Sequence, residues 1–270
     1  MRFIFATFLT LLLVITDSNA YFNQFKPSQF SDRGEIVVEI WNSPEGLKRL
    51  EQSRYKSDFY QLANFFQPQI NPLYCGIASS VIILNAFRSQ DNQIPSQKAL
   101  EATRPEIYGG GSIEFKTYSQ LTFLNEVTEK IKKREVIELK NFRDTEAKID
   151  PGLTLKQLAD MLVAYNLKVV MNYVTEYDAR KVERFRSELK TILNDKDKFV
   201  LVNFKGSDIG LETFGHVSPV AAYDRMSDSV LIMDVASHKN SWYWVKIDHL
   251  FKAMNTRDGN QYRGYLIVSE

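Results

Sequence analysis

The stretch QINPLYCGIASSVIILNAF, residues 69–87, places the strongest demand on the fold. From Cys75 onward, its apolar residues recur at helical spacing and cover most sides of the predicted helix. Pro72 disfavours helix just before it, so the helix should begin at or near Cys75. Because a helix that is apolar on most sides must be covered by other elements, the chain has to build packed layers around this segment.

The second half of the chain contains segments that can form such a layer. They are rich in β-branched and aromatic residues and are separated by polar turns, a pattern typical of strands. The predicted strands are residues 167–174, 199–204, 216–224, 230–236, 242–247 and 263–269. A short helix, DHLFKAM, is predicted between the last two.

The first half is predicted to be mainly helical. A strand is expected over residues 35–40, and Ser43 followed by Pro44 marks a helix start. Further helices are predicted over residues 119–134, 154–165 and 178–194. Thr154 and Gln157 have the spacing of a capping box. The chain therefore favours an α+β fold, with a helical N-terminal lobe, an antiparallel-sheet C-terminal lobe and a cleft between them.

The N-terminus has the pattern of a targeting segment. Arg2 precedes an apolar run over residues 3–15, and small residues lead to Ala20. This pattern predicts a signal peptide over residues 1–20 and a folded domain over 21–270. The run is short for a membrane span, so no stable span is expected after cleavage, and the protein is predicted to be exported, periplasmic or secreted. An uncleaved anchor is the alternative, and it too removes the domain from the cytosol.

The charge pattern limits the class of partner. The 34 basic and 33 acidic residues nearly cancel, and no basic stripe alternates with aromatic residues, which argues against a nucleic-acid partner. A small or neutral partner is expected instead. The single cysteine and the three histidines, His216, His238 and His249, lack the spacing of a zinc site, so no metal site is predicted.

Cys75 is the only cysteine of the chain. In an exported protein it has no partner for an internal disulfide, so it is a free thiol in an oxidising compartment. Such a thiol is either protected in a core or used as a nucleophile. The start of a helix is compatible with the second role, because the helix dipole stabilises a thiolate there.

His216 and Asp234 can supply the partner groups that a thiol nucleophile needs. They lie on two predicted strands joined by the short polar turn RMSDS. With the turn centred near Arg225 and Met226, opposed residues have numbers that sum to about 450, as those of His216 and Asp234 do. Directly opposed residues share a sheet face about 5 Å apart at Cβ. The carboxylate can then hold one imidazole nitrogen while the other takes the proton of the thiol.

The chain order of Cys75, His216 and Asp234, with its long first interval, is that of papain-like thiol enzymes. Gln69 can supply a side-chain amide to an oxyanion, beside the backbone N–H of Cys75. Each of these residues alone fits an ordinary structural role, but together they predict a catalytic triad with an oxyanion donor. The neighbouring aromatic residues are expected to serve in packing: Tyr74, Trp242 and Trp244.

Taken together, these motifs resemble the catalytic domain of phytochelatin synthases, especially their shorter prokaryotic relatives. The segments that carry the resemblance are QINPLYCGIASSVIILNAF, GHVSPVAAYD, LIMDVA, WVKIDHLFKAMNT and RGYLIVS. The similarity covers residues 35 to 269 and identifies residues 21–270 as a phytochelatin synthase-like catalytic domain. It implies a papain-like two-lobed fold and cleavage of the Cys-Gly amide of glutathione through a γ-glutamylcysteinyl thioester.

The resemblance also implies a role for each matched residue. The catalytic candidates are Cys75 as nucleophile, His216 as general acid and base, Asp234 as its orienter and Gln69 as oxyanion donor. The substrate-binding candidates are Gly215 and Arg263, which match positions contacting the γ-glutamyl group, and Asp258, which matches the same pocket over a segment that looks shorter here.

Two departures from the family bear on activity. The family places an arginine three residues after the triad aspartate, where this chain has Ser237, followed by His238 and Lys239. Lys239 is expected to replace that arginine only in part, because an ammonium lacks the bidentate fork of a guanidinium. The plant enzymes also carry a Cys-rich C-terminal domain linked to metal sensing, which this sequence lacks, so metal-regulated polymerisation is in doubt.

The resemblance implies an exported acyltransferase and hydrolase of glutathione, which gives γ-glutamylcysteine as the main product and phytochelatin as the other. No cofactor is required by this chemistry, and cadmium or zinc thiolates of glutathione can serve as the acceptor. Glutathione is the partner implied, and a homodimer is left open. Two alternatives remain. One is a papain-like leader-processing cysteine peptidase, which shares a Gln six residues before a Cys-Gly, and the other is a non-catalytic papain-like binding module.

Overall fold

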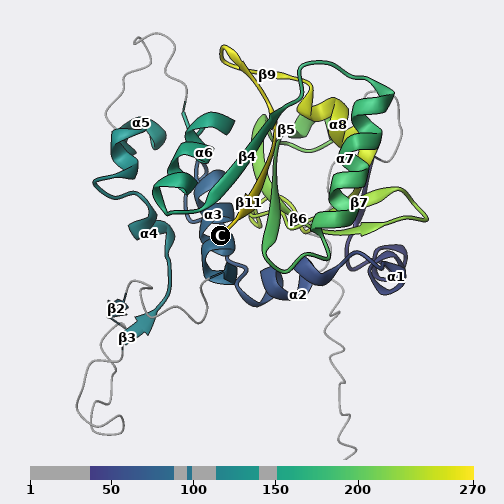
Figure 1. The fold of residues 1–270 in the computed structure, drawn as a ribbon, viewed down its shortest axis with the longest axis horizontal. Coiled ribbons are helices and arrows are strands. Elements are labelled where there is room, and N and C mark those ends of the chain that lie inside the picture. The colour runs from purple at the N-terminus through teal and green to yellow at the C-terminus, as the bar shows by residue number, and fades with distance from the viewer. Residues whose placement is uncertain (1–36, 88–95, 99–113, 140–150) are drawn as a thin grey trace, which may run out of the picture.

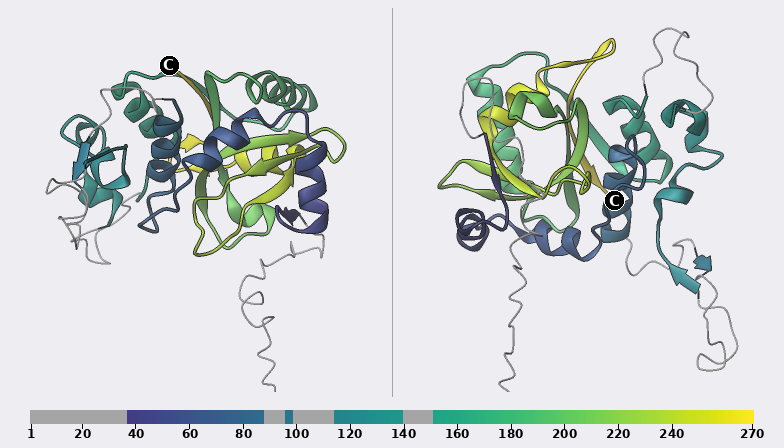
Figure 2. Two further views of the ribbon diagram at one scale, coloured as in Figure 1. Left: turned by 90° about the horizontal axis from the view of Figure 1, so that it is seen from below. Right: turned by 180° about the vertical axis from the view of Figure 1, so that it is seen from behind.

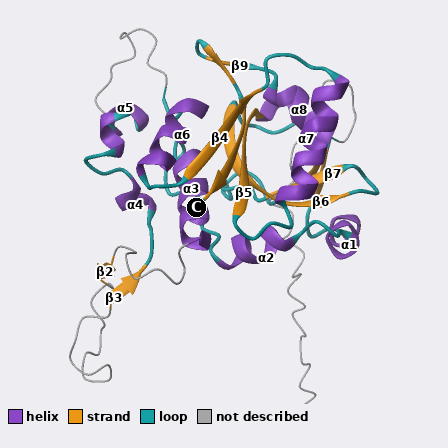
Figure 3. Cartoon of the chain, viewed as in Figure 1, coloured by secondary structure: helices purple, strands orange, loops and turns teal. Residues whose placement is uncertain are grey.

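The computed structural model describes residues 37–87, 96–98, 114–139 and 151–270. The predicted signal peptide, residues 1–20, lies outside the described residues. The described chain has the predicted α+β fold. A group of helices, including α3 (Cys75–Phe87) and α6 (Leu155–Ala164), lies on one side of a large antiparallel sheet. The helices α7 (Ala179–Ile192) and α8 (Ile247–Met254) lie on the other side (Figures 1 and 3).

The large sheet has the strand order β1-β8-β7-β6-β5-β11-β4, and every neighbouring pair is antiparallel. Its strands are β1 (Val38–Ile40), β4 (Lys168–Tyr173), β5 (Lys198–Lys205), β6 (Gly215–Asp224), β7 (Ser229–Ile232), β8 (Tyr243–Lys246) and β11 (Gly264–Ser269). Two small sheets pair β2 (Ser96–Lys98) with β3 (Glu114–Lys116), and β9 (Arg257–Asp258) with β10 (Gln261–Tyr262). The strands predicted in the second half are therefore present, although the one predicted over residues 230–236 ends at Ile232, and β1 from the first half pairs with β8.

Four helices begin at the predicted starts, near Pro44, Cys75, Leu155 and Ala179, whereas the helix over residues 57–64 was not predicted. The helices are α1 (Pro44–Gln52), α2 (Ser57–Asn64), α3 (Cys75–Phe87), α4 (Gln120–Phe123), η3 (Thr128–Lys130), α5 (Arg134–Ile137), α6 (Leu155–Ala164), α7 (Ala179–Ile192), η4 (Gly206–Ile209) and α8 (Ile247–Met254). The Ser43 hydroxyl accepts the Gly46 N–H at 2.9 Å, and the capping box of Thr154 and Gln157 is formed. Asp178 caps α7 through its side chain.

The single helix predicted over residues 119–134 is wrong, because the segment forms α4, η3 and α5 instead. Asn125 accounts for the break. Its side-chain oxygen accepts the backbone N–H groups of Val127 and Thr128 at 2.9 and 3.2 Å, and its own N–H donates to the Thr128 hydroxyl. These bonds start a new turn and replace the acceptors that a continuous helix would supply.

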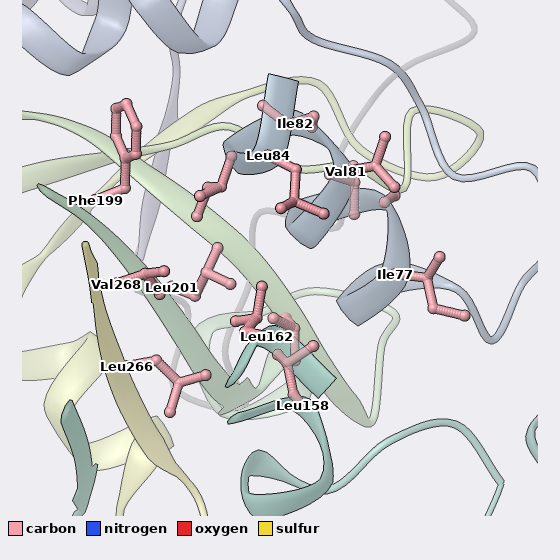
Figure 4. Packing of buried hydrophobic residues seen from close by; sticks show 14 of the residues in the cluster. Ile77, Val81, Ile82, Leu84, Leu158, Leu162, Phe199, Leu201, Leu266 and Val268 are labelled. Carbon is pink, nitrogen blue, oxygen red and sulfur yellow. The ribbon is translucent and has the colours of Figure 1, made fainter. Parts of the chain in front are cut away.

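The helix at Cys75 is buried on all sides, as its composition predicted. Every residue from Gly76 to Asn85 is buried. Figure 4 shows apolar side chains of α3 and α6 gathered against one face of the sheet. The labelled residues are Ile77, Val81, Ile82 and Leu84 of α3, Leu158 and Leu162 of α6, Phe199 and Leu201 of β5, and Leu266 and Val268 of β11. Tyr74 and Trp244 are buried in the same cluster and Trp242 packs against it, so their predicted packing role is confirmed.

The opposite face of the sheet carries a second core, which is covered by α7 and α8 (Figure 2). Val200, Val202 and Phe204 of β5 belong to it, alternating with the residues that face α3. The central strand β5 is therefore buried on both faces. This three-layer arrangement fixes the start of α3 beside the beginning of β6, where the Ser79 hydroxyl donates to the Val217 carbonyl at 3.2 Å.

The buried Asp58 of α2 gives a test of the packing. It is 1% exposed, and its carboxyl oxygens have no hydrogen-bond partner in the described part of the chain. Burial, and then the charge of Asp195, raises the pKa of Asp58 to about 8. The folded state therefore keeps a proton that the unfolded state loses near pH 4. As pH rises from about 4 to about 8, the contribution of this group to the free energy of unfolding falls steadily.

We expect Asp58→Asn to raise the melting temperature at pH 8 by a few degrees, on the order of 1 kcal/mol, and to change it little at pH 5. Scanning calorimetry across this range measures the difference. Asp160→Asn, which removes only a surface partner of Lys156, serves as control. An equal effect of Asp58→Asn at both pH values would contradict the assignment.

Candidate functional site

Cys75 is the first residue of α3, and its thiol is partly exposed. The preceding turn is held by Asn71, whose side chain accepts the Leu73 N–H at 2.9 Å and whose carbonyl accepts the Tyr74 N–H at 3.0 Å. The Tyr74 carbonyl then accepts the Ala78 N–H as the helix begins. This turn places the thiol at the positive end of the helix dipole, where a thiolate is stabilised.

His216 and Asp234 lie in direct contact. The His216 Nε2 is 2.8 Å from Asp234 Oδ1, and both residues are almost completely buried. The Cys75 side chain lines the same cavity as His216 and lies close enough to raise the pKa of the imidazole. Because Nε2 is engaged by the carboxylate, Nδ1 is the nitrogen left for the thiol. The structure thus brings the three predicted residues together from α3, β6 and the segment after β7.

The predicted pairing of His216 and Asp234 across the hairpin is nevertheless wrong in register. Asp224 pairs with Ser229, which gives a sum of 453 near the turn, and a bulge beyond Ala222 shifts the register by one residue. Strand β7 also ends at Ile232, so the strand predicted over residues 230–236 is too long.

The bulge explains why the contact forms all the same. After it, Val220 pairs with Ile232, and the Met233 N–H still donates to the Pro219 carbonyl. Continued by two residues, this register places Asp234 opposite Ser218 and diagonal to His216 on the same face. A diagonal neighbour lies within reach of a long side chain such as imidazole.

The surroundings favour opposite charges on the two buried groups. Burial opposes ionisation of Asp234, but the His216 charge and hydrogen bonds hold the pKa of this carboxyl below its usual value. Burial also opposes a charge on His216, yet Asp234 and then Cys75 raise the pKa of His216 above its ordinary range, to about 10. The imidazole is therefore held in its protonated form around neutral pH.

Sequence reasoning missed two side chains that complete this network. The Ser218 hydroxyl lies 3.1 Å from His216 Nε2, and the Asn240 amide donates to Asp234 Oδ2 at 3.1 Å. The Ala236 N–H also donates to Asp234 Oδ1, at 2.7 Å. Ser218 lies two residues after His216 and thus on the same strand face, a signal that was available. No comparable local pattern marks Asn240.

Gln69 lies beside the nucleophile and lines the same cavity. Its side-chain nitrogen donates one hydrogen bond, to the Asn71 carbonyl at 3.0 Å, and carries a second N–H. Its backbone N–H donates to the Val235 carbonyl at 2.8 Å, which ties the segment before α3 to the residue after Asp234. This position is compatible with the predicted oxyanion role.

A cavity of about 430 Å³ opens beside Cys75 and His216. The three predicted substrate-binding residues, Gly215, Asp258 and Arg263, all line it. Arg263 Nη2 lies 3.0 Å from Asp258 Oδ1. A Cβ on Gly215 would lie 2.8 Å from Arg263 Nη2, so a glycine is needed for the guanidinium to occupy this position. The volume is in the range of small-molecule sites.

Several buried polar atoms of the cavity have no hydrogen-bond partner among the described residues. They are Arg263 Nε, Asn203 Oδ1, Thr213 Oγ1 and Gln69 Oε1. Guanidinium N–H groups bind carboxylates, whereas a carboxylate such as Asp258 and an amide oxygen such as that of Asn203 accept from an ammonium group. The set therefore suits the head group of an α-amino acid. Sequence reasoning missed Asn203, although a polar residue inside the apolar strand FVLVNF was a usable signal.

The residues that follow Asp234 divide between two cavities. His238 and Lys239 line the 430 Å³ cavity, and Lys239 Nζ lies 3.5 Å from the Glu212 carbonyl. Ser237 lines a separate cavity of about 270 Å³, together with Trp41 and Trp242. Lys239 is thus the lysine of this segment that lines the 430 Å³ cavity.

Residues 37–87, 96–98, 114–139 and 151–270 contain no group of three or more His, Cys, Asp or Glu side chains suited to a metal ion. Within the same ranges, no helix has the length and apolar character needed to cross a membrane.

Comparisons with known proteins agree with the geometry. The family model described as phytochelatin synthase matches residues 35–265. Glutathione gamma-glutamylcysteinyltransferase 3 of Lotus japonicus is 28% identical over 234 residues, covering 84% of this chain and 41% of the relative. The transferase of Schizosaccharomyces pombe is 21% identical over 224 residues, covering 82% of this chain and 45% of the relative. The chain thus spans about two fifths of the length of these curated relatives.

The single thiol allows a direct test of the predicted ion pair, because iodoacetamide can report only on Cys75. If protonated His216 holds a thiolate, the alkylation rate at pH 6 should stay within about threefold of that at pH 8, whereas an ordinary thiol would slow by about two orders of magnitude. His216→Gln should lower the rate at pH 6 at least tenfold, and His249→Gln, on α8, should not. A wild-type profile like that of a free thiol would contradict the pair.

Proposed function

Because the chain belongs to the phytochelatin synthase family, we propose that it is a glutathione γ-glutamylcysteinyltransferase with hydrolase activity. The proposal is that it cleaves the Cys-Gly amide of glutathione through a thioester on Cys75. The curated relatives are named glutathione gamma-glutamylcysteinyltransferases, and this chain spans about two fifths of their length. We further propose that the protein acts after export, as its N-terminal sequence predicts.

The first step is acylation of Cys75. Its thiolate attacks the carbonyl carbon of the Cys-Gly amide and forms a tetrahedral intermediate. The backbone N–H of Cys75 and the second side-chain N–H of Gln69 are the proposed donors to the oxyanion. When the C–N bond breaks, the protonated His216 gives its proton to the leaving nitrogen, and glycine departs from a γ-glutamylcysteinyl thioester.

The second step releases the acyl group. His216, now neutral, takes a proton from the attacking water or from the α-amine of a second glutathione. Water gives γ-glutamylcysteine and glutathione gives a phytochelatin, and in both cases the C–S bond breaks and the thiolate returns. Asp234 keeps its charge throughout and stabilises the imidazolium that forms at each turnover. We propose hydrolysis as the main outcome, with cadmium or zinc thiolates of glutathione as possible acceptors.

The γ-glutamyl head group is proposed to bind beside Arg263 and Asp258. Its α-carboxylate would meet the buried guanidinium, and its α-ammonium would meet the carboxylate of Asp258 and the amide oxygen of Asn203. Gly215 keeps this pocket directly next to His216. The head group thus lies on the sheet side of the cavity, while the amide bond is presented to the helix start.

The observation that carries the proposal is the convergence of Cys75, His216 and Asp234 at one end of the cavity. This convergence counts against a binding module that has lost its catalytic residues. The zwitterion-binding set around Arg263 favours an amino-acid head group over an extended leader peptide, which would need a longer groove.

Incubation with glutathione should release glycine and γ-glutamylcysteine in the wild type and not in Cys75→Ser, because an alcohol is not held ionised by His216. Mass spectrometry with and without cadmium or zinc follows both products and any longer ones. Wild-type protein that releases no more glycine than Cys75→Ser would refute the proposal. Glycine without longer products would restrict it to hydrolysis.

Arg263→Lys should lower kcat/KM for glutathione at least tenfold, since loss of one charged hydrogen bond costs about 1.5–3 kcal/mol. Cysteinylglycine lacks the γ-glutamyl head group, so its slower cleavage should change little. The preference for glutathione over cysteinylglycine, measured in the same assay, reports on the pocket. Arg257→Lys, an exposed arginine that stacks on Tyr262, is the matched control. An unchanged preference in Arg263→Lys would remove this residue from head-group recognition.

A further inference from the structure

The Asp234 carboxylate is held at both oxygens. Oδ1 lies 2.8 Å from His216 Nε2 and accepts the Ala236 N–H at 2.7 Å. Oδ2 accepts the side-chain amide of Asn240 at 3.1 Å. The first oxygen is therefore fixed by the imidazole and by backbone, while the second is fixed by a side chain that neither the proposed mechanism nor the sequence pattern includes.

Asn240 is itself firmly placed. It is 7% exposed, and its backbone N–H donates to the Ala236 carbonyl at 3.0 Å, closing the turn that starts at Asp234. The amide thus comes from the same turn as the carboxylate that it holds, and it binds the oxygen that His216 does not contact. Ionised carboxylates form stronger hydrogen bonds than neutral acceptors, so a buried donor at this oxygen has a large effect on both charge and orientation.

We propose that Asn240 is a positioning residue that fixes the Asp234 carboxylate in the orientation from which it pairs with His216. The inference rests on the proposed function for its catalytic meaning, but the geometry that it concerns is independent of substrate. Without the amide, the carboxylate can rotate about its Cβ–Cγ bond. Its ion pair with the His216 imidazolium, which supports the Cys75 thiolate, then weakens. The expected consequence is a thiolate that survives over a narrower pH range.

The neighbouring titratable groups come from three elements. Asp234 is faced by His216 of β6 and Tyr243 of β8, and His216 is also faced by Cys75 of α3. Burial raises the pKa of the Tyr243 hydroxyl, and the nearby charge of Asp234 raises it further. This hydroxyl makes no hydrogen bond of normal geometry to any described residue. Tyr243→Phe is therefore a matched control, because it removes a hydroxyl near the same carboxylate and leaves the Asn240 donor to Oδ2 in place.

Alkylation of Cys75 by iodoacetamide, followed from pH 4 to pH 9, tests the inference without glutathione. Asn240→Leu keeps the branched shape of the side chain but removes the N–H donor, and the 270 Å³ cavity that Asn240 lines leaves room for the larger methyl groups. We expect its alkylation profile to move upward by about one pH unit, equivalent to about a tenfold lower rate on the acidic limb. Asn240→Gln, which retains an N–H donor, should move less, and Tyr243→Phe should stay close to wild type.

A profile of folded Asn240→Leu that coincides with wild type would overturn the inference, as would an equal shift in Tyr243→Phe. Circular dichroism establishes folding. Should Asn240→Leu not fold, Asn240→Asp replaces the donor by an acceptor of the same size, and its profile must shift in the same direction for the inference to stand. The alkylation profile needs no turnover, so it decides the role of Asn240 by itself. An absence of glycine release would refute only the proposed function.

Discussion

The arrangement of the site depends on one buried ion pair, that of His216 and Asp234. Two charges out of water are tolerated only when each is paired and its remaining hydrogen-bonding atoms are satisfied. The surrounding elements meet this demand together: β6 carries the imidazole, the turn after β7 supplies the Ala236 N–H and Asn240, and α3 brings Cys75 beside the imidazole. The bond from Gln69 N–H to Val235 then links the nucleophile segment to that turn.

Local signals in the sequence predicted most of the elements, because they act over a few residues. Ser43 and Thr154 cap their helices as predicted, and the apolar strands appear where alternation or continuous burial indicated them. The break at Asn125 was missed, since a residue that is polar and tolerated in helices gives no sign that its side chain will take two backbone N–H groups. The contact of His216 and Asp234 was predicted from a wrong register, because the alternation of side chains along a strand does not reveal where a bulge inserts an extra residue.

The missed site residues are those whose roles arise only from assembly. Asn203 belongs to no motif in the chain: it matters because β5 carries it to the cavity, next to Asp258. Asn240 gains its role because a turn folds it back on Asp234. The family resemblance supplied Gly215, Arg263 and Asp258, and the structure places all of them around one cavity, but a resemblance transfers only the residues that the family shares.

The polar side of the cavity is hard to explain by stability alone. A buried polar atom without a partner costs about 1–3 kcal/mol, and Arg263 Nε and Asn203 Oδ1 have none among the described residues. The chain even places a glycine at position 215, which leaves the guanidinium room that any side chain would take. A well-packed apolar wall would stabilise the fold more. Groups held in this way are therefore best understood as preorganised for a charged ligand, whose binding would satisfy them.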